Sequence, residues 1–289
     1  MGNAVIIANK GAGSFSQQKL DSVSAALERG RVLIQQKVCS DFSEMTETAA
    51  SISSVNNGPL IIAAGGDGTI NAVLSGLAGN NTSCAILPFG TANALAIELD
   101  VIVPDRAVEK IIRGELRSFT AGIMKNQERS SRFFLAAGVG LDGSVVRSIN
   151  LRTKKLLGKG AYVLSILRHS LLWEKSELVV TADNREFSCH TVVACNASRY
   201  AGAFTLAPNA SIFSPTMEFV ALKGKRRRDF FSLGSDILRG ISRESESVIR
   251  GSFAELRVEG KKPVQVDGDD WGDSPVEIFT EPDYAKIIV

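Results

Sequence analysis

The sequence predicts an α/β protein of two domains, the first built on a parallel sheet and the second mostly antiparallel. Strand-like and helix-like segments alternate from Ala4 to about Thr120, which is the pattern of a parallel sheet. After about Phe119 the pattern changes to short strands separated by turn residues. The chain of 289 residues also exceeds the usual size of one domain, so two cores are expected.

The first domain is expected to span residues 1–120. Its strands are expected at 4–8, 31–38, 60–64 and 83–87, and its helices at 16–29, 44–54, 70–78, 92–98 and 105–113. In the first of these helices Leu20, Val23 and Leu27 recur at helical spacing, which places one face on the sheet.

The second domain is expected to span residues 121–276. Its strands are expected at 133–137, 178–182, 191–195, 218–222, 253–258 and 263–266, with one helix at about 160–173. The remaining segment, 277–289, is strand-like and is expected to pack back on the first domain. The crevice between the two domains is the default position for a site.

Composition narrows the classes of partner. The chain has 33 Lys and Arg against 31 Asp and Glu, a net charge of +2, so it gives no global case for nucleic acid. No apolar run approaches the ~20 residues that span a bilayer, and the first residues do not form a signal peptide, so we expect a cytoplasmic protein. The four cysteines form no C-x-x-C pair, so neither zinc nor disulfides are expected.

A glycine-rich turn follows the strand 60–64. Gly65, Gly66 and Gly68 let backbone N–H groups approach a phosphate closely, and the helix-like segment after them favours an anion at its N-terminus. Asp67, between these glycines, suits a metal or a proton. An ordinary strand-to-helix corner explains the same residues equally well when they are taken alone.

A second strand end has the same character. Gly90, Thr91 and Asn93 follow the strand 83–87. The carboxyl ends of parallel strands meet at one edge of a sheet, so both turns are expected to face one ligand. This second turn favours a phosphate site over a purely structural corner.

Five motifs in order now resemble one family, the diacylglycerol kinase catalytic-domain superfamily, which includes bacterial lipid kinases, sphingosine kinases and ceramide kinases. They are Gly65 to Asn71, Pro88 to Asn93, Gly138 to Asp142, Asn196 followed by Gly202 and Leu206-Ala207-Pro208, and Val266 to Asp269. The resemblance implies a Rossmann-like domain followed by a β-sandwich domain, as in NAD kinase and diacylglycerol kinase. It also implies transfer of the γ-phosphate of ATP to a lipid hydroxyl.

The resemblance implies ATP and Mg²⁺ as cofactors, with Asp67 at the metal. The residues that it assigns to the nucleotide are Asn9, Lys10, Gly11, Gly13, Ser40, Gly65, Gly66, Asp67, Gly68, Thr69, Asn71, Gly90, Thr91 and Asn93. For Asn71 and Asn93, bracing of the loops and helix capping remain equally open.

The catalytic residues that the resemblance implies are Asp67, Asp267 and Asp269. Asp267 is expected to be the general base that takes the proton of the lipid hydroxyl, and Asp269 to assist it. A plain β-turn explains Asp267 to Asp269 equally well in isolation. Asp142 is expected either in a polar network that links the domains or as a turn residue.

Several positions depart from the family pattern. Lys10 stands in place of Pro, and Ser14 in place of a common Lys. Phe213-Ser214-Pro215 stands where bacterial diacylglycerol kinases have Asp-Asp-Gly, so the structural Mg²⁺ site of those enzymes is expected to be absent. These departures leave the acceptor open among diacylglycerol, ceramide or another sphingolipid, and phosphatidylglycerol. They also leave open a soluble-substrate kinase similar to NAD kinase, and an inactive lipid- or nucleotide-binding regulator.

A basic segment offers a route to the membrane. Lys225, Arg226, Arg227 and Arg228 precede Phe230 and Phe231, a composition that suits peripheral contact with an anionic leaflet. A solvated loop before a core-packed helix is the alternative. The segment 152–173 is a second candidate. The sequence leaves oligomeric state open, a homodimer included.

Overall fold

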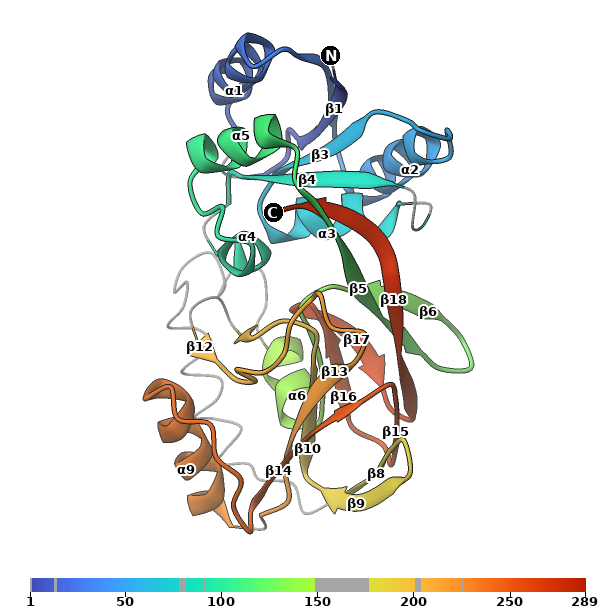
Figure 1. Cartoon of the computed structure of the whole chain (residues 1–289). Coiled ribbons are helices and arrows are strands. Elements are labelled where there is room, and N and C mark those ends of the chain that lie inside the picture. Colours follow the sequence, from blue (N-terminus) through green and yellow to red (C-terminus); the bar gives the residue numbers. More distant parts are fainter. Residues whose placement is uncertain are drawn as a thin grey trace. The chain divides into compact units, whose positions relative to one another are not determined.

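The computed structural model describes residues 2–12, 15–77, 79, 82–90, 92–148, 177–200, 204–224 and 226–289 (Figure 1). The chain divides into two compact units, which we call unit 1 (Met1–Thr120 with Pro282–Val289) and unit 2 (Ala121–Glu281). The helix expected at about 160–173, with its membrane candidate, lies outside the described residues.

Unit 1 is a parallel sheet with helices between its strands. The sheet has the order β2 (Val32–Cys39), β1 (Gly2–Asn9), β3 (Leu60–Gly65), β4 (Ser83–Pro88) and then the end of β18 (Val276–Ile288), and each of these pairings is parallel. The helices are α1 (Gln17–Arg29), α2 (Phe42–Ser53), α3 (Asp67–Ser75), α4 (Ala94–Glu98) and α5 (Pro104–Arg113). As the spacing predicts, α1 buries Leu20, Val23 and Leu27.

Helix α3 begins earlier than its apolar pattern indicates. It starts at Asp67 rather than at residue 70, because Gly66 takes the extended N-cap position and its carbonyl accepts from the N–H of Ile70 at 3.0 Å. Asp67 in the first turn also complements the positive end of the helix dipole. The glycine turn is therefore the first turn of a helix.

Unit 2 is formed by two layers of antiparallel strands. One sheet has the order β14 (Val248–Phe253), β13 (Met217–Leu222), β10 (Thr191–Cys195), β7 (Ala136–Val139), β16 (Pro263–Val266) and β17 (Asp269–Asp273). The other layer has the order β18, β15 (Glu255–Glu259), β8 (Leu178–Ala182) and β9 (Arg185–Cys189), with neighbours paired antiparallel. Side chains from both layers, such as Phe219 and Leu256, share one core, which makes a β-sandwich.

The remaining elements lie around these sheets. They are β5 (Leu116–Lys125), β6 (Ser130–Phe133), α6 (Leu141–Ser148), the two-stranded β11 (Arg199–Tyr200) and β12 (Phe204–Thr205), and α9 (Arg227–Leu238). No helix within the described ranges is long and apolar enough to cross a membrane.

Two expected strands are interrupted where a carboxylate takes backbone N–H groups from the ladder. The strand expected at 133–137 is broken between β6 and β7, because the N–H groups of Phe134 and Leu135 donate to Asp267. The strand expected at 253–258 is broken at Ala254, whose N–H donates to Asp183 at 3.1 Å. The strand-like segment expected at 277–289 forms one long strand, β18, which ends at Ile288.

Candidate active site

The two glycine-rich strand ends of unit 1 are in direct contact. Gly65 at the end of β3 is in register with Pro88 at the end of β4, and the N–H of Phe89 donates to the carbonyl of Gly65 at 2.9 Å. A Cβ on Gly90 would lie 2.4 Å from the Cα of Gly66. Only glycine permits this approach, so the two turns form one continuous surface.

Asp67 holds the two turns together. Its Oδ2 accepts from the N–H of Asn93 at 3.1 Å and its Oδ1 from the N–H of Ala94 at 2.7 Å. The second bond satisfies an N–H of the first turn of α4 that has no partner within that helix. Asp67 thus has a structural role that the motif alone does not reveal, while each carboxylate oxygen keeps a further lone pair.

Asn93 braces its own turn. Its backbone is left-handed, with φ of 48°, and its Nδ2 donates to the carbonyl of Gly90 at 2.7 Å. Asn93 stands at the N-cap of α4, but its side chain makes no capping bond. Its Oδ1 is buried and accepts no hydrogen bond from the described residues. Asn71 lies inside α3, where its Oδ1 accepts from the hydroxyl of Ser75 at 3.2 Å.

The loops after β1 and β2 supply further candidate residues. Asn9 Oδ1 accepts from the N–H of Gly11 at 2.7 Å, and the N–H of Lys10 donates to the carbonyl of Cys39 at 3.0 Å. The N–H and hydroxyl of Ser40 donate to Glu44 at 2.6 and 2.5 Å, and these bonds lower the pKa of the Glu44 carboxyl. Ser40 therefore orders the start of α2. The candidates Gly13 and Thr91 lie outside the described residues.

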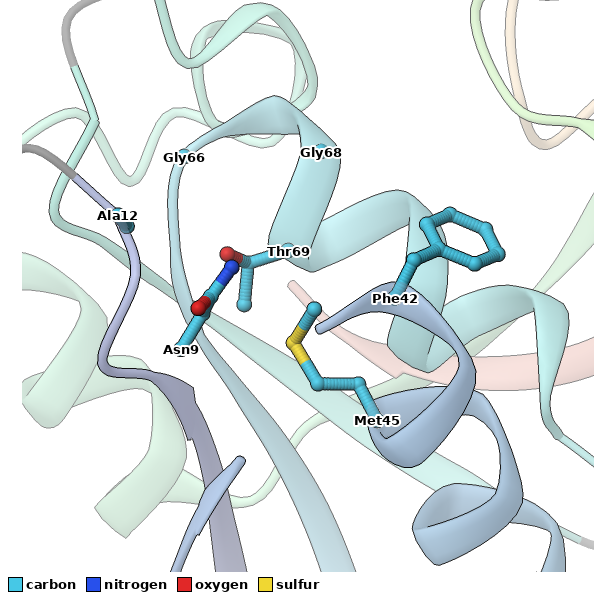
Figure 2. Close-up of a pocket in the computed structure, with 7 residues that line it drawn as sticks. All are labelled: Asn9, Ala12, Phe42, Met45, Gly66, Gly68 and Thr69. Atoms are coloured by element: carbon cyan, nitrogen blue, oxygen red, sulfur yellow. The ribbon is translucent and has the colours of Figure 1, made fainter. Parts of the chain in front are cut away.

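A pocket of about 360 Å³ opens beside the first turn of α3 (Figure 2). It is lined by Asn9, Ala12, Phe42, Met45, Gly66, Gly68 and Thr69. A Cβ on Gly68 would have no atom within 4 Å, and Phe42 is 51% exposed although it is large and apolar. The pocket therefore combines open space over glycine backbone with an exposed aromatic side chain.

In unit 2, Asp267 occupies a socket of backbone donors. Its carboxylate accepts from the N–H groups of Phe134 at 2.8 Å, Leu135 at 2.9 Å and Ala136 at 3.0 Å. Burial raises the pKa of Asp267 to about 6, against these three bonds, which lower it. Asp269, the second carboxylate of this motif, is exposed at the start of β17.

Asp142 lies in a buried polar network near the same motif. Its Oδ2 accepts from Gln265 Nε2 at 2.6 Å and its Oδ1 from the hydroxyl of Tyr200. Burial raises the pKa of Asp142 to about 6, while the bond from Gln265 lowers it. Gln265 and Tyr200 were not predicted as site residues. A signal for Gln265 exists, because it is a polar residue between Val264 and Val266 in an otherwise apolar strand.

Acidic and thiol side chains do not gather around a metal in the described part of the chain, where no group of three or more His, Cys, Asp or Glu is placed to hold one. Any cation at the glycine turns would be held by fewer than three such side chains among the described residues. Mg²⁺ commonly binds in this way, through one or two carboxylates together with substrate phosphates.

Two family models cover nearly the whole chain. Residues 3–124 match the diacylglycerol kinase catalytic domain, and residues 136–289 match the YegS C-terminal NAD kinase beta sandwich-like domain. A diacylglycerol kinase of Bacillus subtilis (strain 168) is 27% identical over 237 residues, or 79% of this chain and 77% of that protein. A putative lipid kinase of Staphylococcus carnosus (strain TM300) is 24% identical over 232 residues, or 78% and 74%.

Solved structures share the fold. A diacylglycerol kinase from Bacillus anthracis str. Sterne superposes with a TM-score of 0.80 at 20% identity, covering 99% of this chain and 96% of that one. An NAD kinase from Archaeoglobus fulgidus in complex with ATP superposes with a TM-score of 0.52 at 16% identity, covering 100% and 94%. With both of its domains matched by family models, this chain belongs to the diacylglycerol kinase catalytic-domain family of lipid kinases, which are phosphotransferases.

Proposed function

We propose that this protein transfers the γ-phosphate of ATP to the hydroxyl of a membrane lipid, with Mg²⁺ as cofactor. The observation that carries the proposal is the joined pair of glycine turns, in which Gly66 and Gly90 touch and Asp67 locks both turns. Rigid glycine backbone beside a helix N-terminus is suited to binding and orienting a polyphosphate.

We assign the nucleotide to the pocket beside α3. The open space above Gly68 and the first turn of α3 suit the phosphates, since N–H groups at a helix start attract anions. Phe42, an exposed aromatic residue in the lining of the same pocket, offers a ring face for the adenine. The ATP-bound NAD kinase has a similar fold, which supports ATP as the donor.

Mg²⁺ fits the oxygen donors beside this pocket. Asp67 is a carboxylate with lone pairs left over, and Asn93 Oδ1 is a buried acceptor with no hydrogen bond from the described residues. Both are the hard oxygen ligands that Mg²⁺ prefers. When bound, the ion would neutralise charge on the phosphates during transfer. These two residues are therefore our candidates for holding it.

For the general base, the contacts favour an exchange of the two roles expected from the sequence. Asp267 is committed to three backbone N–H groups and so anchors the turn. Asp269, two residues later, presents an exposed carboxylate that a lipid hydroxyl can reach. We therefore assign the base to Asp269 and the anchoring of the turn to Asp267.

Contact with the membrane would be made by helix α9. Phe230, Leu233 and Ile237 pack against a core cluster of unit 2, while Phe231 is 49% exposed and Arg226 and Arg228 are exposed beside it. An exposed aromatic ring flanked by arginines suits the headgroup region of an anionic leaflet. Lys225 and the side chain of Arg227 lie outside what the structure describes.

The acceptor is tested by incubating the protein with labelled ATP and Mg²⁺ and a panel of lipids in mixed micelles. The panel holds diacylglycerol, ceramide, a sphingoid base and phosphatidylglycerol, with NAD as a soluble acceptor. We expect label in at least one lipid and none in NAD. Label in NAD alone would show that the acceptor is a soluble molecule and not a lipid. The absence of label in every acceptor would contradict the proposal.

Matched substitutions distinguish the roles of the two carboxylates. Asp269→Asn should abolish turnover while leaving thermal stability and ATP binding unchanged. Asp267→Asn should lower both turnover and stability, because its new amide N–H₂ would face backbone donors. The reverse pattern, with a stable inactive Asp267→Asn variant and an active Asp269→Asn variant, would return the base to Asp267.

A further inference from the structure

The turn that carries Asp267 and Gly268 is held from inside unit 2. It joins β16 to β17, with Val266 paired to Asp269, and both of its residues are left-handed, with φ of 48° and 88°. Two residues with positive φ define the tight type of hairpin turn whose twist matches the strands. The position of Asp269 therefore depends on how this short turn is anchored.

Gln265 connects the turn to a buried carboxylate. Its Oε1 accepts from the N–H of Gly268 at 2.8 Å, and its Nε2 donates to Asp142 at 2.6 Å. Because the carboxylate can only accept, the Gln265 amide has one orientation, with its oxygen toward Gly268. The hydroxyl of Tyr200, in β11, donates to the other oxygen of Asp142. A continuous chain of hydrogen bonds thus runs from Tyr200 to the turn.

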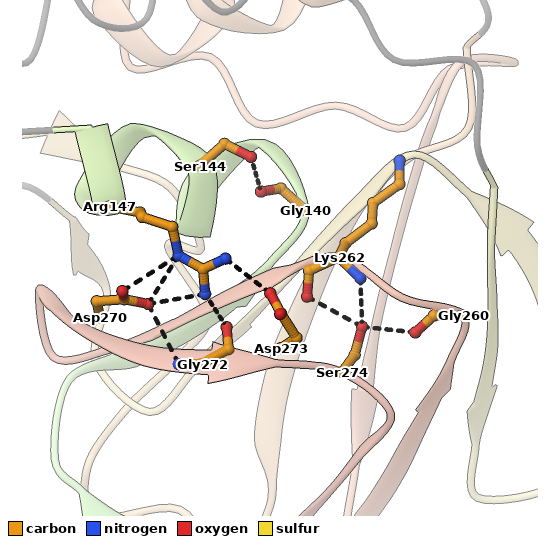
Figure 3. Close-up of polar contacts among 9 residues, drawn as sticks. All are labelled: Gly140, Ser144, Arg147, Gly260, Lys262, Asp270, Gly272, Asp273 and Ser274. Atoms are coloured by element: carbon orange, nitrogen blue, oxygen red, sulfur yellow. Dashed lines mark hydrogen bonds and ion pairs between the residues drawn. The ribbon is translucent and has the colours of Figure 1, made fainter.

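Helix α6, which carries Asp142, is itself fixed to the β16–β17 hairpin. Arg147, five residues further along α6, binds Asp270 at 3.0 Å and Asp273 at 2.7 Å on β17 (Figure 3). The helix also packs directly on β16, since a Cβ on Gly143 would lie 2.2 Å from the carbonyl oxygen of Pro263. Asp142 is therefore held toward Gln265 by a helix that is itself fixed in place.

We propose that Asp142, Gln265 and Tyr200 are positioning residues that set the orientation of the Asp267–Gly268 turn and thereby aim Asp269 at the acceptor hydroxyl. The inference rests on the proposed function, in which Asp269 is the base. Apolar side chains would fill the positions of Asp142 and Gln265 at lower desolvation cost. A fully satisfied buried network instead fixes one geometry, which a reacting carboxylate needs.

The carboxylate of Asp142 and the amide of Gln265 can be exchanged between the two positions without changing the buried charge. In Gln265→Glu, assayed at alkaline pH where the pair cannot share a proton, a second carboxylate faces Asp142, so the two side chains repel and the turn shifts. In the double variant Asp142→Asn with Gln265→Glu, the new amide donates to the new carboxylate, whose other oxygen accepts from Gly268. Gln35→Glu is the matched control, because it makes the same change at an exposed position of β2 in unit 1.

We expect Gln265→Glu to lower kcat on the order of 100-fold with KM for ATP unchanged, as for a misplaced reacting group. The double variant should recover most of kcat, and Gln35→Glu should behave as wild type. Tyr200→Phe, which retains the ring, should lower kcat several-fold. A Gln265→Glu variant as active as wild type, or a folded double variant as inactive as Gln265→Glu, would overturn the proposal.

Hydrogen exchange of the Gly268 amide gives a readout that needs no lipid. Exchange should be faster in Gln265→Glu and in Tyr200→Phe than in wild type, and it should return toward the wild-type rate in the double variant. Unchanged exchange in both single variants would overturn the positioning role. If the wild type phosphorylates no lipid, the proposed function fails on its own, while the exchange rates still decide whether this network holds the turn.

Discussion

Gly68 and Gly90 belong to similar motifs but have opposite surroundings. A Cβ at Gly90 would meet Gly66 Cα at 2.4 Å and Asn93 Oδ1 at 2.5 Å, whereas a Cβ at Gly68 would meet nothing within 4 Å. Gly90→Ala should therefore destabilise unit 1 and abolish ATP binding, because the two turns must separate. Thermal unfolding and titration with ATP measure the two effects.

Gly68→Ala should have the opposite effect on stability. Alanine is the better helix former, so the variant should gain about 0.5 kcal/mol in α3. Its methyl group would nevertheless occupy the space that we assign to a phosphate, so ATP binding should weaken. A stabilised variant with wild-type affinity for ATP would show that the phosphates do not bind above Gly68.

The buried carboxyl of Asp142 should make stability depend on pH. Burial raises its pKa from 3.8 to about 6 in the folded protein. Between these values the folded state binds more protons than the unfolded state, so stability falls as pH rises and levels off above pH 6. A shift of this size corresponds to about 3 kcal/mol at most.

Asp142→Asn removes this dependence. The variant should therefore gain free energy of unfolding relative to wild type as pH rises from about 4 to 7, as measured by urea denaturation at several pH values. Below pH 3.8, where Asp142 is protonated in both states, the difference between the two proteins should stop changing. A difference that is constant throughout would contradict a raised pKa.

At the level of single residues, the sequence predicts the side chains that belong to motifs. It does not predict the side chains that hydrogen-bond to those motifs and hold them in place. Asp67, Asp267 and Asp269 are visible because each stands beside a glycine after a strand. Gln265 is not, because its partners Asp142 and Gly268 are brought to it only by folding. The socket of N–H groups around Asp267 is hidden for the same reason.

Among the elements, α9 makes the clearest prediction about the membrane. Phe231→Ser and Arg228→Glu should each weaken sedimentation of the protein with vesicles that contain phosphatidylglycerol, since both side chains are exposed. Electrostatic attraction contributes about 1 kcal/mol per arginine near an anionic surface. Added salt should therefore weaken binding, and vesicles of phosphatidylcholine alone should bind less protein.

Two variants serve as controls for this surface. Leu33→Ser removes an apolar side chain that is 57% exposed on β2 of unit 1, and it should leave vesicle binding unchanged. Phe230→Ser should instead lower thermal stability, because Phe230 packs against the core cluster of unit 2. Equal losses of vesicle binding in Leu33→Ser and Phe231→Ser would contradict a specific role for α9.

Periodicity predicts the elements of unit 1 well, because the inner strands β1, β3 and β4 each contain an unbroken apolar run. The start of α3 at Asp67 was not predicted, since glycines usually indicate a turn. In unit 2, the breaks at Phe134–Leu135 and at Ala254 depend on carboxylates more than 70 residues away in sequence. An apolar pattern alone does not reveal such long-range competition for backbone N–H groups.

At the scale of the whole molecule, the C-terminal end completes unit 1. Lys286 and Ile287 of β18 pair in parallel with Ser83 and Cys84 of β4. The buried hydroxyl of Tyr284 donates to the carbonyl of Leu74 at 2.6 Å and to that of Leu77 at 2.9 Å. The strand-like segment 277–289 predicts a returning strand, but the bonds of Tyr284 to the end of α3 follow only from the fold.

Unit 1 should therefore depend on a segment that is separated in the sequence from the rest of the unit. Deleting Pro282–Val289 uncovers the edge of β4 and the cavity that Tyr284 fills, so we expect an aggregating protein that binds no ATP. Tyr284→Phe keeps the ring against Phe119, at 5.7 Å between centroids, and removes only the hydroxyl. Because the buried carbonyls of Leu74 and Leu77 both lose the hydroxyl, and that of Leu74 keeps the N–H of Leu77 at 3.2 Å, it should lower the free energy of unfolding by about 1–3 kcal/mol, measured by urea denaturation. A truncated protein that unfolds at the wild-type urea concentration would show that unit 1 is complete without its last strand.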